Sequence, residues 1–149
     1  MTARAPARRR NRTRLVGGVL LVIYLAFAAA VVLWPQRVDG DPLQVYRVLY
    51  DLYDRGLPRW LTYNVVQFVA NVVLTAPIGF FLAMMLPRHL WWVAAAACAA
   101  VFAAVEGAQL FLPARVPSLL DLLANSLGGF LGALGWRLAG RSSEEPRLY

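Results

Sequence analysis

The sequence has no lysine, one cysteine and one histidine, and these scarcities narrow the chemistry it can support. A single cysteine, Cys98, excludes an intrachain disulfide, and its alanine-rich surroundings favour a packing role. The one histidine, His89, stands far along the chain from the acidic residues. A histidine-based zinc site or a Ser-His-Asp triad therefore has no support. We predict no metal, no cofactor and no assigned catalytic residue.

Positive charge is in excess, and the net charge is +7. All 15 basic residues are arginines. Six arginines precede the first apolar block: Arg4, Arg8, Arg9, Arg10, Arg12 and Arg14. A basic run at that position sets membrane topology and attracts anionic lipid headgroups. No basic face or recognition motif accompanies the run, so we predict no nucleic-acid partner.

Hydrophobic residues make up 60% of the chain, and they lie in blocks of about 20 residues, enough to cross a bilayer. We predict an all-α integral membrane protein with four transmembrane helices in a compact bundle. We expect a basic cytoplasmic tail over 1–14, a membrane domain over 15–138 and a cytoplasmic tail over 139–149. Within the membrane domain, the predicted spans are at about 15–34, 65–86, 90–112 and 119–138, and an outer loop covers 35–64.

The apolar block of the first span is longer than the hydrophobic core of a signal peptide, which favours an uncleaved helix. The run Ala28–Ala30 resembles a signal-peptidase cleavage site, so a signal peptide stays the alternative. Orientation follows from arginine counting. With the N-terminus inside, ten arginines lie inside and five outside. Cytoplasmic loops carry the excess of basic residues, so we predict that both termini are cytoplasmic.

The outer loop carries signals for one short helix. Asp41 and Pro42 are typical of a helix start, and Gly56 followed by Pro58 is typical of a stop. Apolar residues between them recur at helical spacing. We predict an amphipathic helix along the outer membrane surface that seals the bundle, with a lid over a site as the alternative.

Small residues recur along the fourth span. Ala124, Gly128 and Gly132 follow i, i+4, i+8 spacing, which lets helix backbones approach closely. In a four-helix chain such a stripe more often packs within the chain, and homo-oligomerisation stays open as the second interpretation.

Polar residues inside the spans are the candidate site. The second span carries Asn64, Gln67, Asn71 and Thr75 on one helical face, the third carries Glu106 and Gln109, the fourth carries Asp121 and Asn125, and Arg115 lies in the turn between the last two. Helix geometry places Asn71, Glu106 and Asn125 at one depth, with Gln67, Gln109 and Asp121 nearer the outer surface. A buried carboxylate is costly, so we expect Glu106 to pair with Arg115, to bond to amides, or to be protonated. These residues either hydrogen-bond the helices to one another or line an outward-facing pocket.

Three stretches resemble the VanZ-like family: Asn71–Phe80, Glu106–Arg115 and Asp121–Gly128. In that family an acid and a glutamine end one helix, an arginine follows in the turn, and an Asp-x-x-x-Asn pair opens the next helix. Ala114 departs from the glycine more usual before the arginine. The resemblance implies a multi-pass protein of the bacterial inner membrane. The family's namesake is associated with resistance to the glycopeptide antibiotic teicoplanin, which makes glycopeptide tolerance an expectation.

Three functions are compatible with these features. The first is a non-enzymatic module whose outward pocket binds a lipid-linked cell-wall precursor or another anionic headgroup through Asn71, Glu106, Gln109, Arg115, Asp121 and Asn125. The second is a membrane enzyme acting on an isoprenoid or glycolipid, with Glu106 or Asp121 as general base. The third, a transporter, is weaker because four short-looped helices show no inverted repeat.

Overall fold

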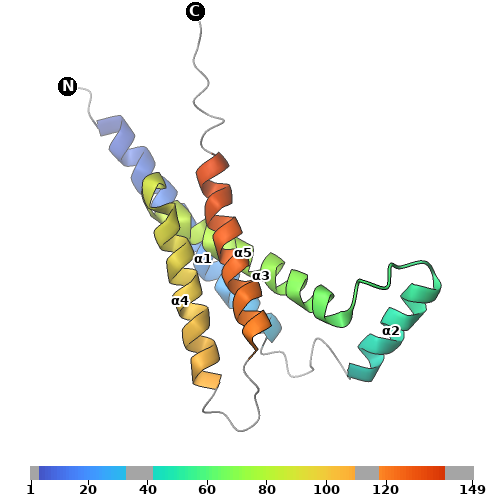
Figure 1. Ribbon diagram of the computed structural model, residues 1–149. Helices are drawn as coiled ribbons and strands as arrows, with labels where there is room; N and C mark the ends of the chain where they lie inside the picture. The colour runs from blue at the N-terminus through green and yellow to red at the C-terminus, as the bar shows by residue number, and fades with distance from the viewer. Residues whose placement is uncertain (1–3, 33–41, 110–117, 140–149) are drawn as a thin grey trace, which may run out of the picture.

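The computed structural model describes residues 4–32, 42–109 and 118–139, and this part of the chain is helical without strands (Figure 1). The elements are α1 (Arg4–Val32), α2 (Pro42–Asp54), α3 (Tyr63–Met85), a 3-10 turn η1 (Arg88–Leu90), α4 (Trp91–Gln109) and α5 (Leu119–Ala139). Four of the described helices contain segments long and apolar enough to cross a membrane: Arg10–Ala30, Tyr63–Met85, Arg88–Ala108 and Leu119–Ala139. The prediction of an all-α protein with four membrane helices is confirmed.

The observed helices match the predicted spans closely, with one difference at the start of the chain. α1 begins at Arg4, so the basic segment expected to be a tail is itself helical. Arginine is a good helix former, and no proline or glycine separates this segment from the apolar block after Pro6. Residues 110–112, included in the third predicted span, lie outside the described residues.

The predicted amphipathic helix is present as α2, and its end has a clear cause. Gly56 has a φ of 100°, the left-handed conformation that glycine adopts without strain. Its N–H donates to Tyr53 O at 3.1 Å, and the Leu57 N–H donates to Leu52 O at 2.9 Å. These two bonds form a Schellman motif, which satisfies the last carbonyls of the helix. Among the described elements, α2 contacts α3 alone.

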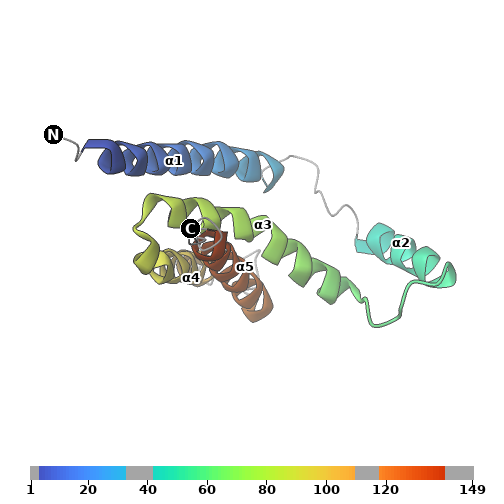
Figure 2. The same cartoon turned by 90° about the horizontal axis from the view of Figure 1, so that it is seen from above.

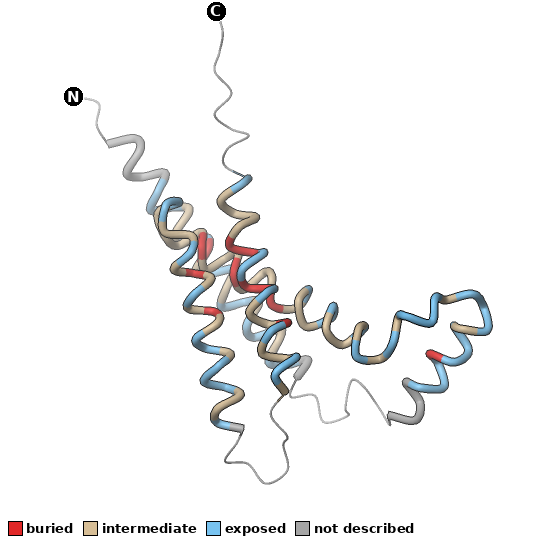
Figure 3. The backbone as a smooth tube through the Cα atoms, in the orientation of Figure 1, coloured by how far each residue is buried: buried red, intermediate tan, exposed pale blue. Residues whose placement is uncertain are grey.

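The core lies where α5 packs against α3 and α4, and the buried positions gather there (Figure 3). Most of these buried residues are alanine and glycine. A Cβ placed on Gly132 would meet the carbonyl oxygen of Ala76, and one placed on Gly79 would meet the backbone of Gly129. On its other side, Gly129 faces Cys98 of α4. These backbones approach so closely that even a methyl group has no room, as expected for helices that associate through glycine.

By contrast, α1 contacts only α3 among the described helices and lies antiparallel to it (Figure 2). Gly17 is the close contact, facing Met84 and the Phe81 carbonyl. The Tyr24 hydroxyl donates to Leu74 O at 2.7 Å. This bond joins α1 to α3 one residue after Val73, whose carbonyl loses its helical donor because Pro77 has no N–H.

The start of α1, the α3–α4 junction and the end of α5 lie at one end of the bundle (Figure 1). Arginine and tryptophan side chains pair there. The Arg88 guanidinium lies 4.8 Å from the Trp136 ring centre, and that of Arg137 lies 5.4 Å from the Trp91 ring centre. Each pair joins α5 to the α3–α4 junction, and such contacts contribute about 0.5–1 kcal/mol at exposed sites.

Candidate functional site

Asp121 is the centre of the polar cluster, at the end of the bundle opposite the start of α1. Its Oδ1 accepts a hydrogen bond from Asn71 Nδ2 at 3.0 Å and a second from Gln67 Nε2 at 3.3 Å. Gln67 and Asn71 lie one turn apart on α3, so both amides reach the same oxygen. The side-chain contact joins α3 to α5 at the point where α3 diverges from the bundle.

Local sequence positions Asp121 for this contact. Ser118 precedes α5, and its Oγ accepts from the Asp121 N–H at 3.2 Å, while its carbonyl accepts from the Leu122 N–H at 3.1 Å. This is the N-cap arrangement, which satisfies free N–H groups of the first turn. Asp121 therefore sits in the first turn of α5, where the helix dipole favours a negative charge.

Glu106 enters the cluster through the same serine. Glu106 lies in the last turn of α4, and its Oε2 accepts from the Ser118 N–H at 3.0 Å. A continuous set of hydrogen bonds thus runs from Glu106 through Ser118 to Asp121 and on to the two amides of α3. Three helices are held together at this end by one polar network.

The network is rich in acceptors and is not neutralised by a described cation. Glu106, Asp121 and Asn71 are each half-buried, so both carboxylates keep some contact with the surroundings. No described arginine forms an ion pair with either carboxylate. Carboxylates only accept hydrogen bonds when ionised, so their free lone pairs suit hydroxyl, amide or ammonium donors.

The other predicted site residues are placed unevenly. Asn125 lies one turn after Asp121 and is half-buried, without a hydrogen bond from its side chain to the described residues. The side chain of Gln109 and the whole of Arg115 lie outside the described residues. The expected Glu106–Arg115 pair therefore stays a prediction, as does a ligand-binding role for all six residues.

Asn71 bonds to Asp121, one turn before Asn125 on α5. α3 runs obliquely across α5 and continues away from it toward α2 (Figure 1). The common depth of Asn71, Glu106 and Asn125 stays a prediction.

Two residues had roles that the sequence did not indicate. Ser118 looked ordinary, yet it links both acids, and the signal available was its position three residues before Asp121, the spacing of an N-cap. Thr75 shared a face with Asn71 but lies outside the network. Its hydroxyl donates to the Asn71 carbonyl at 2.8 Å, and it packs against Gly128.

Comparison with known families gives one match, to the model described as VanZ/LLP1, over residues 21–140. The chain belongs to the VanZ/LLP1 family. The matched range contains the complete polar cluster, the last part of α1 and the whole of α3, α4 and α5. No curated protein and no solved structure matches the chain. Membership in the VanZ/LLP1 family accords with a multi-pass membrane protein, and the role of the cluster rests on its own geometry.

Proposed function

We propose that this VanZ/LLP1 protein is a non-enzymatic membrane module whose polar cluster binds the headgroup of a lipid-linked cell-wall precursor. The supporting observation is the arrangement around Asp121, where two carboxylates and two amides from three helices share one network. Intramembrane acids near a membrane surface are candidates for function because burying them is costly. Glycopeptide tolerance would follow if the module alters access to that precursor.

The chemistry of the cluster suits such a headgroup. Sugar hydroxyls and peptide amides are donors, and the partly accessible oxygens of Glu106 and Asp121 are acceptors. Arg115, in the connection between α4 and α5, would supply the phosphate contact, because a guanidinium binds phosphate through two parallel hydrogen bonds. The proposed ligand therefore has a donor-rich portion and an anionic portion.

A photo-crosslinking lipid phosphate tests the proposal in the full chain. Labelling near residues 118–125 should fall several-fold in Asp121→Asn and in Arg115→Ala. Asp51→Asn, on the exposed surface of α2, is the control and should label like the wild type. Equal labelling of the wild type, Asp121→Asn and Arg115→Ala would contradict the proposal.

A double variant separates binding from stability. Glu106→Ala or Arg115→Ala alone should destabilise the protein more than Glu106→Gln, because removing one member of a buried pair leaves a charge uncompensated. Glu106→Gln combined with Arg115→Gln should recover stability if the two residues pair. Labelling should stay lost if they bind the ligand, and recovery of both would assign the pair a purely structural role.

The enzyme hypothesis has a direct test. Ser118 caps α5 through its hydroxyl oxygen, which accepts from the Asp121 N–H. If purified protein turns over a labelled isoprenoid or glycolipid and Glu106→Gln abolishes this activity, the enzyme hypothesis is correct and the binding proposal is wrong.

The proposal also requires the cluster to face the outside. A reporter active only in the cytoplasm should work when fused after Leu148 and fail when inserted near Gly40. The positive-inside bias of the arginines predicts this result, and the reverse pattern would place the cluster at the cytoplasmic surface.

A further inference from the structure

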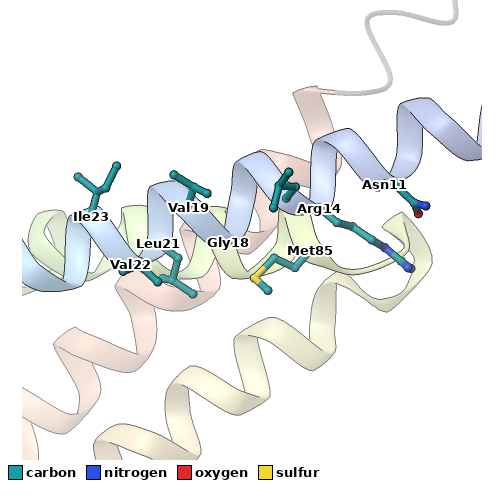
Figure 4. Close-up of a pocket in the computed structure, with 9 residues that line it drawn as sticks. Asn11, Arg14, Gly18, Val19, Leu21, Val22, Ile23 and Met85 are labelled. Carbon is teal, nitrogen blue, oxygen red and sulfur yellow. The ribbon is translucent and has the colours of Figure 1, made fainter.

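A second region, at the opposite end of the bundle, has the features of a ligand site. A groove of about 750 Å³ runs along α1 beside the end of α3 (Figure 4). Its walls are aliphatic, with Leu15, Val19 and Val22 on α1 and Met85 on α3. Leu15 is 69% exposed and Val22 is 67% exposed. Since α1 contacts only α3 among the described helices, the groove opens toward the membrane.

One end of the groove is polar. Asn11 and Arg14 lie there, one turn apart on α1 (Figure 4). The Nε of Arg14 is buried and has no hydrogen-bond partner in the described part of the chain. A buried donor without an acceptor is unfavourable, and a guanidinium is best satisfied by an anion that accepts two hydrogen bonds.

No described acid supplies that acceptor. The acidic side chains described are Asp51 and Asp54 on α2 and Glu106 and Asp121 in the polar cluster. All of them lie away from the start of α1 (Figure 1). Arg10 and Arg12 are exposed beside the groove and add to the positive charge. The polar end is therefore complementary to an anion that the described residues do not supply.

The dimensions fit one leaflet of a bilayer. The part of the groove between Arg14 and Ile23 is aliphatic, and at 1.5 Å per residue these two residues lie about 14 Å apart along α1. Half of a hydrocarbon core of about 30 Å is about 15 Å. An arginine at the level of the phosphates would thus have the aliphatic groove extending below it to the middle of the membrane.

We propose that this groove binds one phospholipid with an anionic headgroup, from the leaflet on the side of the N-terminus. Its phosphate accepts hydrogen bonds from Arg14 and Asn11, and one acyl chain lies against Gly18, Val22 and Met85. Most of the groove, including Arg14 and Gly18, precedes the segment that matches the family, which begins at residue 21. The site is independent of the proposed function of the polar cluster.

Native mass spectrometry of the full chain in detergent tests this site. The probes are phosphatidylglycerol and phosphatidylcholine with the same acyl chains, titrated into delipidated protein. The wild type should retain one phosphatidylglycerol per chain and prefer it about tenfold, because both lipids carry the phosphate but the choline of phosphatidylcholine adds a positive charge beside the arginines. Arg14→Gln should abolish the preference, whereas Arg12→Gln, which removes the same charge outside the groove, should change it less than about twofold.

A second pair of variants tests the aliphatic part. A Cβ on Gly18 would lie 3.5 Å from the Cε of Met85, so the longer side chain of Gly18→Leu should fill the groove and reduce retention of both lipids. Val16→Leu, on an exposed surface that does not line the groove, is the control. Circular dichroism and a single elution peak establish that each variant is folded.

Three outcomes would overturn the proposal. Equal losses in Arg14→Gln and Arg12→Gln would show diffuse attraction by the basic run. Equal retention of the two lipids by the wild type would show that the groove does not select an anionic headgroup. Efficient disulfide cross-linking of Val22→Cys chains into dimers, unaffected by added phosphatidylglycerol, would show that a second copy occupies the groove.

Discussion

The α3–α5 and α1–α3 contacts both join membrane helices through glycine, and they differ in how much else supports them. In α3–α5, Gly79, Gly128 and Gly132 bring backbone against backbone, and the network around Asp121 closes the far end. In α1–α3, Gly17 is one close contact and Tyr24 makes one hydrogen bond. Lipid tails can replace apolar side-chain contacts between helices at little cost, so close backbone contacts and hydrogen bonds hold a membrane helix in position. By this criterion α5 is held on α3 more firmly than α1.

The largest expected effect is a methyl group inside the α3–α5 contact. Gly132→Ala places a Cβ on the Ala76 carbonyl, so the helices must separate, at a cost of about 1–3 kcal/mol or more. Gly107→Ala is the matched control, since a Cβ there meets nothing within 4 Å. It should be neutral or stabilising by about 0.5–1 kcal/mol. Unfolding in lipid nanodiscs measures both, and equal stabilities would contradict the close-packed α3–α5 interface.

The next effect concerns the polar end of the same interface. Asp121→Ala leaves the amides of Gln67 and Asn71 without their acceptor, which should lower the free energy of unfolding by about 1–3 kcal/mol. Asp121→Asn keeps an acceptor oxygen and should cost less. Asp51→Ala, exposed on α2, should stay within about 0.5 kcal/mol of the wild type. If Asp121→Ala behaves like Asp51→Ala, the network does not contribute to stability.

A smaller effect is expected for α1. Tyr24→Phe removes the hydrogen bond to Leu74 O and should cost about 0.5–1.5 kcal/mol. Tyr50→Phe on α2, where the tyrosine is 66% exposed, controls for loss of a hydroxyl and should have no effect. Hydrogen exchange along α1 is the sensitive measurement. Unchanged exchange in Tyr24→Phe would show that α1 is held by Gly17 and its neighbours alone.

The smallest effect is expected on the surface of α1 that faces lipid. Leu25→Ala should change stability by less than about 0.5 kcal/mol, because Leu25 is exposed to the membrane in the folded protein. Leu82 packs against the core cluster of Ala83, Ala94 and Ala133, so Leu82→Ala should cost clearly more. Comparable losses from the two changes would place α1 in a tighter assembly than the contacts with α3 provide.

The sequence predicted the helices and their inward faces well, but it did not predict which residues of neighbouring helices contact each other. Hydrophobic length alone placed α3 and α5 within two residues of their observed ends. The stripe of Ala124, Gly128 and Gly132 is buried as spacing indicated. What faces a glycine cannot be predicted from the glycine, because a residue without a side chain carries no chemical complementarity. The contact between Gly79 and Gly129 was therefore not foreseen.

The candidate site shows the same limit. Periodicity grouped Gln67 with Asn71 on one face and gave Asp121 an inward direction, and these residues do meet. The role of Ser118 and the groove beside Met85 depend on how helices tilt and diverge. Tilt is set by side-chain packing between helices, which a single sequence does not specify.

Every other described helix contacts α3, and this has a consequence for biogenesis. Chains are synthesised from the N-terminus, so α1 enters the membrane without a partner and waits for α3. The surface of α3 around Gly79 and the amides of Gln67 and Asn71 then stay uncovered until α5, the last described helix, leaves the ribosome. A chain released before residue 119 would lack the core and the candidate site together. A quality-control protease that recognises exposed polar groups in a membrane could then detect the truncated chain by the uncovered amides of α3.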